Sequence, residues 1–524
     1  KLEGFDTTFL PFDQGDRHGA GNPLNPDGYA TAYLWERIWS RESWLEILGR
    51  YLIAQRNAKK QITRILFPRF HQLDATRKLQ QAILSEGPGQ KYLIQHSAGS
   101  GKTNSIAWSA HFLADLHDAH DNKVFDSVLV VSDRRVIDGQ LQEAIFGFEK
   151  VVGVVATITG DQGSKSGELA EALAGNKKIV VCTIQTFPKA LEKVCELAAT
   201  QGKRFAVIAD EAHSSQAGEA ASKLKQVLSA EEQQELADGG TVSTEDILAA
   251  QMASKVADNG ITYVAFTATP KAKTLELFGR RPDPSRPAGE GNLPEPFHVY
   301  SMRQAIEEKF ILDVLRNYTS YKLAFKLANL GGAMDDTEVE QSAAVKGLIN
   351  WVKLHPHNIG QKVQIVVEHF RETIATLLNG RAKAMVVVSS RLEAVRWQLA
   401  INKYIDQKHY PLRTLVAFSG EVNDPESGPE PFAETSPLLN PNLKGQEIRE
   451  AFKGDYYQIL LVANKFQTGF DQPLLCGMYV DKRLAGIQAV QTLSRLNRSY
   501  PGKDETFVLD FVNDSEEILK AFRS

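Results

Sequence analysis

The stretch YLIQHSAGSGKTNSIAW, residues 92–108, decides how this chain folds. Its apolar start, Tyr92–His96, predicts a strand, and the apolar residues that follow Thr103 predict a helix. A glycine-rich loop that ends in Lys102 and Thr103 joins the two. A strand, a glycine-rich turn and a helix in this order form the context that a phosphate-binding loop requires.

The residues of this loop match the tasks of binding a nucleoside triphosphate. The glycines would let backbone N–H groups approach the phosphates, where the helix N-terminus adds positive potential. Lys102 would contact the β- and γ-phosphates, and the Thr103 hydroxyl would bind Mg²⁺. His96 replaces the first glycine of the usual GxxxxGK(S/T) pattern, so the loop alone is also compatible with a plain turn between strand and helix. We expect ATP and Mg²⁺ as cofactors, held here by Gly99, Ser100, Gly101, Lys102 and Thr103.

Short β-branched runs that end in polar or small residues occur in two sets along the chain. The first set comprises Tyr92–His96, Ser127–Ser132, Lys178–Thr183, Phe205–Asp210 and Thr262–Thr267. The second set comprises Ala384–Ser389, Thr414–Ser419, Gln458–Ala463, Leu475–Asp481 and Thr506–Asp510. Near-continuous apolar runs separated by helical stretches are typical of parallel sheets that helices cover on both faces. The chain is therefore predicted to be α/β, with two lobes.

The remaining segments complete the predicted organisation. The predicted domains are a remnant or linker region (1–66), a first lobe that binds the nucleotide (67–300), a helical connector and insertion (301–380) and a second lobe (381–524). Within the connector, residues 302–315 and 341–380 are predicted to be helical, and Glu421–Lys444 is predicted to be a long loop in the second lobe. The first segment carries tryptophans at roughly helical spacing, which favours a packed core over a base-stacking platform: Trp35, Trp39 and Trp44.

An acidic pair, Asp210 and Glu211, closes one apolar run of the first set. A carboxylate at the carboxyl end of a parallel strand faces the crevice in which α/β proteins bind ligands. Asp210 would hold Mg²⁺ and Glu211 would orient the attacking water, which are the two carboxylate tasks of phosphoryl transfer. Alone, such a pair is more often a solvated loop, but here it follows a phosphate-binding loop within the same predicted lobe.

With these motifs in place, residues 67–500 resemble the motor of superfamily 2 translocases, and more narrowly the R (restriction) subunit of type I restriction enzymes. The opening FLPFDQGDRHGAGNPLNPDGYATAYLWE stretch and the DEAHSSQ stretch carry the narrower resemblance. The motifs of the family occur in order at Phe70–Gln72, Val131–Arg134, Thr183–Gln185, Thr267–Thr269, Val388–Arg391, Gln467–Asp471 and Gln491–Arg498. In the last motif, Ser494 and Asn497 stand where related helicases carry glycine. The resemblance implies two tandem RecA-like lobes with parallel sheets, plus helical N-terminal and connector segments.

The resemblance also implies roles for residues of the nucleotide site. Gln72 would read the adenine edge, and Gly469 and Asp471 would join the site. Arg495 and Arg498 lie three positions apart on a predicted helix, so they would share a face and reach the γ-phosphate held by the first lobe. Without the phosphate-binding loop, two arginines on a solvated helix face would be the default interpretation. The predicted catalytic residues are Lys102, Glu211, Arg495 and Arg498.

DNA contacts are implied at a second group of residues. These are Arg134, Thr183, Gln185, Arg391 and Thr468. Hydroxyls, amides and guanidinium groups at strand ends suit phosphate contacts, which position a duplex without reading its sequence. A local hydrogen bond or a solvated loop explains each of them equally well.

The function that the resemblance implies is ATP-dependent translocation on double-stranded DNA, in a cytoplasmic restriction-modification complex with methyltransferase and specificity subunits. A strand-separating superfamily 2 helicase would carry the same motifs, and a non-catalytic scaffold would have no use for the complete catalytic set. The family's R subunit also cuts DNA, with a D…ExK nuclease placed before the motor. The nearest pattern here, Glu307-Glu308-Lys309, is predicted to be a surface charge cluster in the helical connector. We therefore expect that this chain alone does not cleave DNA and that the nuclease lies in a segment before Lys1.

Composition narrows the classes of protein without choosing a partner. The 524 residues carry a formal net charge of −4, so DNA binding would need a local basic track. No run approaches the ~18 apolar residues of a membrane span. The three cysteines have no metal-ligand spacing, and Cys182 and Cys476 lie in apolar runs, which predicts buried thiols in a reducing cytoplasm.

Overall fold

The computed structural model describes residues 10–56, 61–132, 140–148, 153–158, 165–174, 177–183, 186–210, 213–214, 242–243, 260–320, 356–466 and 470–523. By its internal contacts the chain divides into two units. The first comprises Lys1–Ala230 and Val242–Phe310, and the second comprises Glu231–Thr241 and Ile311–Ser524.

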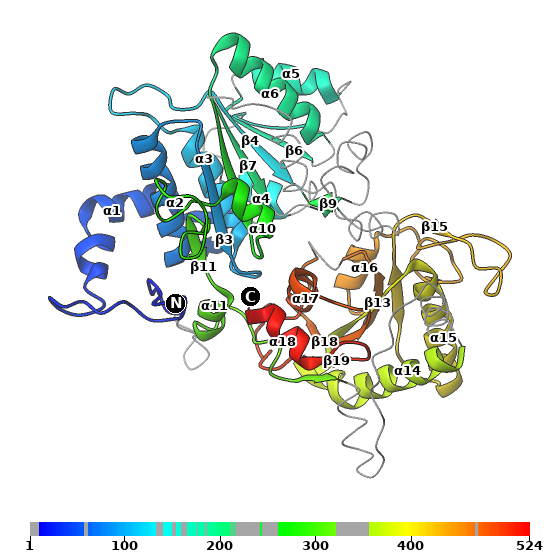
Figure 1. The fold of residues 1–524 in the computed structure, drawn as a ribbon. Coiled ribbons are helices and arrows are strands. Elements are labelled where there is room, and N and C mark those ends of the chain that lie inside the picture. The colour runs from blue at the N-terminus through cyan, green and yellow to red at the C-terminus, as the bar shows by residue number, and fades with distance from the viewer. Residues whose placement is uncertain are drawn as a thin grey trace. The chain divides into compact units, whose positions relative to one another are not determined.

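The first unit is built on a seven-stranded sheet with the order β11-β3-β10-β7-β4-β6-β5 (Figure 1). Every strand pair in it is parallel. Its strands are β3 (Lys91–His96), β4 (Ser127–Ser132), β5 (Val155–Thr157), β6 (Ile179–Thr183), β7 (Phe205–Asp210), β10 (Ile261–Thr267) and β11 (His298–Tyr300). The helices of this unit are α2 (Phe70–Glu86), α3 (Lys102–Ala114), α4 (Gln140–Gly147), α5 (Lys165–Ala174), α6 (Phe187–Gln201), α10 (Ala272–Phe278) and α11 (Met302–Glu307).

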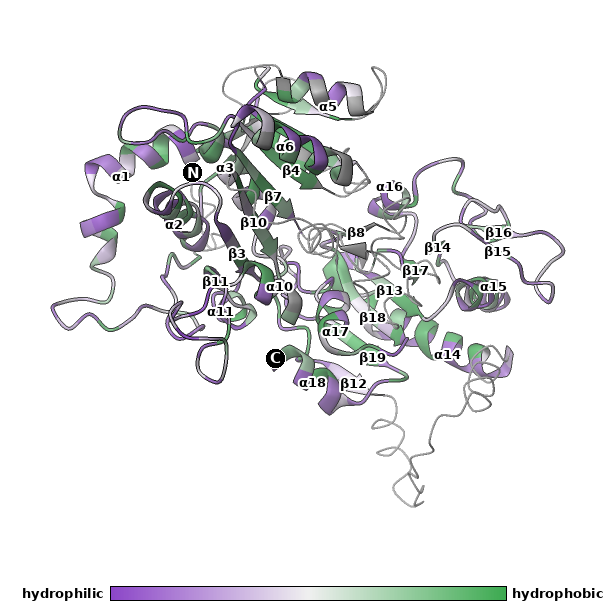
Figure 2. Cartoon of the chain, turned by 45° about the horizontal axis from the view of Figure 1, so that its top comes forward, coloured by the Kyte–Doolittle hydropathy of each residue, from purple (hydrophilic) through white to green (hydrophobic). Residues whose placement is uncertain are grey.

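The strands are mostly apolar because both faces of the sheet are buried. In β4, Val128 and Val130 share one core cluster with Trp108 of α3. Leu129 and Val131 point to the opposite face and are equally buried. Figure 2 shows the strands of this sheet as mainly hydrophobic and the helices beside them as mixed in polarity. Burial on both faces is what a parallel sheet requires, and it explains the runs without polar alternation.

The second unit contains a six-stranded parallel sheet with the order β12-β19-β18-β13-β17-β14. Its strands are β12 (Tyr318–Ser320), β13 (Lys383–Val388), β14 (Thr414–Ala417), β17 (Ile459–Ala463), β18 (Leu475–Asp481) and β19 (Phe507–Asp510). The helices are α14 (Pro356–His369), η5 (Phe370–Ile374), η6 (Leu377–Gly380), α15 (Arg391–Lys408), α16 (Ile448–Lys453), α17 (Gly486–Leu493) and α18 (Ser515–Arg523). A short hairpin, β15 (Glu421–Val422) with β16 (Phe432–Ala433), lies in the predicted loop 421–444.

The two-sheet α/β prediction is confirmed, because all ten apolar runs form strands of these two sheets. Sequence reasoning missed β5, β11 and β12, each only three residues long. In the predicted insertion, residues 341–355 lie outside the described part of the chain. From Pro356 onward the expected apolar face is buried at Val363, Val366, Val367, Phe370 and Ile374, and Leu377 is half-buried.

The helical connector is shorter than predicted, and its charged residues are not all on the surface. Helix α11 ends at Glu307, because Lys309 adopts a left-handed conformation with φ of 60°. Glu308 is only 3% exposed and accepts hydrogen bonds from Tyr300 Oη (2.7 Å) and Gln304 Nε2 (2.8 Å). The prediction of a surface charge cluster at 307–309 is therefore wrong for Glu308, whose pKa is raised by burial.

The segment before the phosphate-binding loop packs onto the first unit through residues other than its tryptophans. It contains η2 (Leu34–Ile38), α1 (Arg41–Glu46), η3 (Ile47–Tyr51) and the antiparallel pair β1 (Ile53–Arg56) and β2 (Ile62–Leu66). Tyr33, Ile38, Ile47 and Tyr51 enter the core. The prediction of a tryptophan core is wrong, since Trp35, Trp39 and Trp44 are 48%, 57% and 38% exposed. An extended Ser40 interrupts the helix, so one helical face does not continue from the first tryptophan to the last.

Two smaller expectations can be compared with the structure. Cys182, Cys195 and Cys476 are buried and form no disulfide within the described residues, and burial was predicted for the first and the last of them. Within the described ranges, no helix combines the length and apolar character needed to cross a membrane.

Candidate active site

The predicted phosphate-binding loop lies between β3 and α3, at the carboxyl edge of the first sheet. Gly99 and Gly101 have φ of 91° and 81°, in the region that favours glycine. A Cβ on Gly101 would lie 2.8 Å from Gln72 Nε2, so a side chain here would displace Gln72. Lys102 and Thr103 are the first two residues of α3, where backbone N–H groups are not used inside the helix.

Helix α2 holds this loop by direct hydrogen bonds. His71 Nε2 lies 3.0 Å from the Ser100 carbonyl, and Gln72 Nε2 donates to the Gly101 carbonyl at 3.0 Å. Gln72 Oε1 accepts from the Arg69 amide at 3.0 Å, so both ends of this side chain have protein partners. The structure thus places Gln72 against the loop, and its reading of an adenine edge stays a prediction.

The carboxyl ends of three neighbouring strands meet beside this loop. β10 pairs with strands on both sides, with Thr267 opposite Gln95 of β3 and Phe266 opposite Asp210 of β7. Asp210 therefore ends a strand that lies two strands away from β3, where the loop starts. At the usual strand spacing this separation is roughly 10 Å. Glu211, the second predicted carboxylate, lies outside the described residues.

The chemistry at this edge fits a magnesium nucleotide. Ser97 Oγ and Ser100 Oγ are buried without a hydrogen-bond partner in the described part of the chain, so the loop has hydroxyl groups to offer phosphate oxygens. Thr103 and Asp210 supply the hydroxyl and carboxylate oxygens that Mg²⁺ prefers. Among described residues, no cluster of three or more His, Cys, Asp and Glu side chains suited to a metal ion occurs. Such a cluster is not needed, because Mg²⁺ is usually held by one or two protein groups together with phosphate oxygens.

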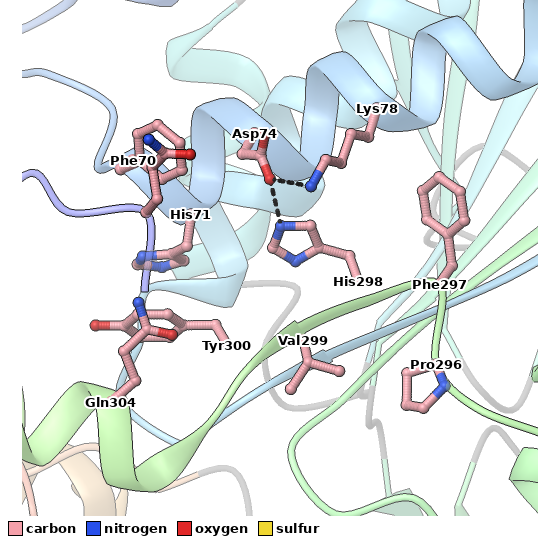
Figure 3. Close-up of a pocket in the computed structure, with 11 residues that line it drawn as sticks. Phe70, His71, Asp74, Lys78, Pro296, Phe297, His298, Val299, Tyr300 and Gln304 are labelled. Carbon is pink, nitrogen blue, oxygen red and sulfur yellow. Dashed lines mark hydrogen bonds and ion pairs between the residues drawn. The ribbon is translucent and has the colours of Figure 1, made fainter. Parts of the chain in front are cut away.

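A set of histidines beneath the loop was not identified as functional from the sequence. His96 Nε2 lies 2.9 Å from His298 Nδ1, and His298 Nε2 lies 3.2 Å from Asp74 Oδ2. His71 stacks on Tyr300 with ring centroids 3.6 Å apart. His71, His298, Asp74 and Tyr300 line a cavity of about 200 Å³, and Figure 3 shows Asp74 between His298 and Lys78. The departure at His96 from the usual loop pattern was the one signal in the sequence.

Burial lowers the pKa values of His71 and His96. It lowers the pKa of His71 to about 3, with a hydrogen bond to Ser100 opposing the shift, and it lowers the pKa of His96 well below the ordinary value. Burial alone would raise the pKa of the Asp74 carboxyl. Hydrogen bonds from His298 and Lys78 outweigh burial and hold that pKa below its ordinary value. His71 and His96 are therefore neutral and Asp74 is ionised at neutral pH.

The second unit gathers the residues of its last two motifs, but not on one helix. Helix α17 ends at Leu493, so the prediction that Arg495 and Arg498 share a helical face is wrong. After the helix the chain turns, and Arg498 forms a bridge with Ile311. The two side chains nevertheless converge on one segment. Arg495 Nη1 donates to the Phe470 carbonyl at 3.0 Å, and Arg498 Nε donates to Asp471 Oδ1 at 3.0 Å.

A buried lysine supports this arrangement. Lys503 Nζ donates to the carbonyls of Leu496 (2.8 Å) and Arg498 (2.9 Å), and the residue is 4% exposed. Burial lowers the pKa of Lys503 to about 8. Gly469, predicted to join the nucleotide site, lies outside the described residues.

The predicted DNA contacts are only partly described. Arg134, Gln185 and Thr468 lie outside the described residues. Thr183 is buried, and its hydroxyl lies 3.1 Å from Thr186 Oγ1, which is the local hydrogen bond that the sequence left open. Arg391 begins α15 and directs Nη1 toward the Ser419 and Glu421 carbonyls at 3.3 and 3.4 Å.

Two family models match parts of the chain. Residues 71–346, over half of the chain, match the family described as SWI2/SNF2 ATPase. Residues 439–513 match the family described as Type I restriction enzyme subunit R domain 3.

Curated relatives point to the same enzymes. The type I restriction enzyme SsaAORF53P endonuclease subunit of Staphylococcus saprophyticus is 24% identical, over 86% of this chain and 44% of its own length. The type I restriction enzyme HindI endonuclease subunit of Haemophilus influenzae is 22% identical, over 84% of this chain and 38% of its own. The putative type I restriction enzyme MjaVIIP endonuclease subunit of Methanocaldococcus jannaschii is 31% identical, over 31% of this chain and 15% of its own. The chain thus spans less than half the length of these relatives.

Proposed function

This chain belongs to the SWI2/SNF2 ATPase family, and this membership supports the conclusion that it is an enzyme that hydrolyses ATP. We propose that it is a DNA-dependent ATPase that translocates on double-stranded DNA. The observation that carries the proposal is the loop between β3 and α3. There two glycines with positive φ, a helix N-terminus, and two buried serine hydroxyls that have no hydrogen-bond partner among the described residues lie around the position of Lys102. These features together suit a triphosphate.

In this proposal the first unit binds and polarises ATP. Lys102 neutralises charge on the β- and γ-phosphates, and backbone N–H groups at the start of α3 donate to them. Thr103 and Asp210 would hold Mg²⁺, which would supply positive charge to the phosphates. Glu211 orients the attacking water. Gln72, whose amide donates to the Gly101 carbonyl, reads the adenine edge in this proposal.

The second unit contributes the arginines. Arg495 and Arg498 stabilise the charge on the transferred phosphoryl group, a task worth roughly 10³–10⁵ in rate where an arginine finger performs it. Asp471 holds Arg498 in the described conformation, so Arg498 must exchange a carboxylate partner for phosphate oxygens. This exchange couples hydrolysis to a change in the second unit. Alternating grip on one DNA strand by the two lobes then advances the motor.

We further propose that the chain is the motor part of the R subunit of a type I restriction enzyme. Similarity to curated endonuclease subunits and the match at residues 439–513 support this assignment. In that setting its partners are double-stranded DNA and the methyltransferase and specificity subunits. Arg134, Thr183, Gln185, Arg391 and Thr468 are the proposed DNA contacts. The described residues 302–310 hold the nearest ExK pattern at the end of a helix, so we propose that this chain alone does not cleave DNA.

A single set of assays tests the proposal. ATP turnover is measured without DNA, with linear duplex and with single-stranded DNA, each at two salt concentrations, for the parent chain and for Lys102→Ala. We expect duplex to stimulate the parent, high salt to weaken that stimulation, and the variant to be inactive. Displacement of a triplex strand without unwinding of a forked duplex identifies a translocase, and unwinding of the fork identifies a helicase. Turnover that DNA does not change would refute the motor assignment.

A further inference from the structure

The phosphate-binding loop is held at three points from beneath. His71 contacts the Ser100 carbonyl, and Gln72 contacts the Gly101 carbonyl. The third point is His96, the last residue of β3, whose side chain is fully buried and lies against His298. His298 belongs to β11, the edge strand next to β3, and is itself held by Asp74 of α2. All three points therefore lead back to helix α2, and Figure 3 shows the contact between Asp74 and His298.

The partners of these rings determine which nitrogen carries hydrogen. The Asp74 carboxylate only accepts, so His298 Nε2 must donate to it. His96 Nδ1 has no hydrogen-bond partner in the described part of the chain. A buried N–H without a partner is rarer than a buried acceptor without one, which favours the tautomer with hydrogen on His96 Nε2. His96 Nε2 then donates to His298 Nδ1, and the bonds run in one direction from His96 through His298 to Asp74.

We propose that His298 is a positioning residue for nucleotide binding. Its ring bonds Asp74 of α2 on one side and His96 on the other, and it thereby fixes the start of the phosphate-binding loop. The inference rests on the proposed binding of ATP to this loop. None of the three residues needs to touch the nucleotide. The side chain that stands in place of the usual glycine has a task of its own: it ties the loop to a neighbouring strand.

The fold makes this tie important for the path of the loop. β11 pairs with β3 over only three residues, His298 to Tyr300. Immediately after β3, the Ser97 amide donates to the Tyr300 carbonyl at 2.9 Å, so the first bond of the loop also depends on β11. If His298 lost its acceptor, the buried His96 N–H would need another partner. The ring and the backbone at the start of the loop would then shift, and binding of a triphosphate would have to restore them.

The two nitrogens of His298 can be tested separately by two amides. Asparagine places a carbonyl oxygen near the position of ring Nδ1, so His298→Asn keeps an acceptor for His96. Glutamine reaches the position of ring Nε2, so His298→Gln keeps contact with Asp74 and leaves His96 without its acceptor. His298→Ala removes both. Lys78→Ala is the matched control, since half-exposed Lys78 pairs with the same Asp74 oxygen at 2.6 Å but stands outside the chain of histidines.

The experiment measures the affinity of the full 524-residue chain for a non-hydrolysable ATP analogue by calorimetry. The KM and kcat for ATP are measured on the same proteins. We expect His298→Ala and His298→Gln to weaken binding about tenfold and to raise KM with little change in kcat. We expect the affinity of His298→Asn for the analogue to stay within about threefold of the parent's affinity. We expect Lys78→Ala to bind the analogue as tightly as the parent does.

Each outcome decides the inference. Equal affinity of His298→Ala and the parent, or equal affinity of the Asn and Gln variants, would overturn it. If His298→Ala fails to fold, the contrast between the two amide variants still decides. A parent chain that does not bind the analogue would refute the proposed function and this inference together, whereas a parent that binds and an Ala variant that binds equally would refute the histidine tie alone.

Discussion

Replacing Gly101 with alanine separates two effects that the structure assigns to one position. Gly101 is left-handed, with φ of 81° and ψ of 33°, and an added Cβ would lie 2.8 Å from Gln72 Nε2. The matched control is Gly202, which is also left-handed, at φ of 63° and ψ of 19°, with open space around a Cβ. Both glycines lie in the first unit, so both variants are compared in the same unfolding transition.

The magnitudes follow from these geometries. A left-handed alanine costs about 1–2 kcal/mol, and this cost applies to both variants. Gly101→Ala also displaces Gln72 and breaks its hydrogen bond to the loop, which adds about 0.5–1.5 kcal/mol. We therefore expect Gly202→Ala to lose about 1–2 kcal/mol of unfolding free energy, and Gly101→Ala to lose about 1.5–3.5 kcal/mol.

Urea unfolding of the parent and the two variants measures these losses, and calorimetry with an ATP analogue measures nucleotide affinity. Only Gly101→Ala should lose affinity, because only that backbone contacts the proposed phosphates. Equal destabilisation of both variants would contradict the close contact between Gly101 and Gln72. Unchanged nucleotide affinity in Gly101→Ala would contradict the assignment of the loop.

Three further predictions test other parts of the molecule. Arg498→Ala should lower DNA-stimulated ATP hydrolysis about 10³-fold or more while ATP binding persists, as turnover and calorimetry would show; near-normal turnover would remove the arginine from catalysis. Burial lowers the pKa of Lys503 to about 8, so between about pH 8 and 10 the unfolded chain binds a proton that the folded chain lacks. The unfolding free energy of the second unit should therefore rise with pH in that window, and Lys503→Met should flatten the rise in urea titrations; an unaltered slope would place the titration elsewhere. Trp39→Ala should cost about 1 kcal/mol or less, whereas Trp108→Ala, at a position only 1% exposed, should cost about 3–5 kcal/mol; similar losses in thermal unfolding would contradict the exposure of the N-terminal tryptophans.

Local patterns predicted the sheets and the phosphate-binding loop well. The loop occupies a few consecutive residues between an apolar strand and an apolar helix, so its context can be read without knowledge of the remaining chain. The ten apolar runs form strands because continuous apolar sequence fits only a sheet that is buried on both faces. Similarly, Asp210 stands at the carboxyl end of an apolar run, and this position predicted that it lies at the carboxyl edge of the first sheet.

Features that depend on the end of a helix were predicted less well. The spacing of Arg495 and Arg498 indicated one helical face, but α17 ends at Leu493 and the arginines lie in the turn that follows. The two side chains still converge, because Arg495 bonds the Phe470 carbonyl and Arg498 bonds the Asp471 carboxylate, and Phe470 and Asp471 are neighbours in another part of the chain. The prediction of a tryptophan core was wrong for the same reason. An extended Ser40 breaks the helical period on which the prediction depended.

The sequence by itself therefore determined the two parallel sheets, the position of the loop between β3 and α3, and the residue types that the loop presents. Only the tertiary structure decided what lies behind the loop. His96 and His298 are 202 positions apart, and they meet because β11 pairs with β3 at the edge of the sheet. A burial pattern records which residues avoid water, since that preference acts on each residue locally. It does not record which strand becomes a neighbour, because strand order follows from how the connecting segments pack over the whole unit.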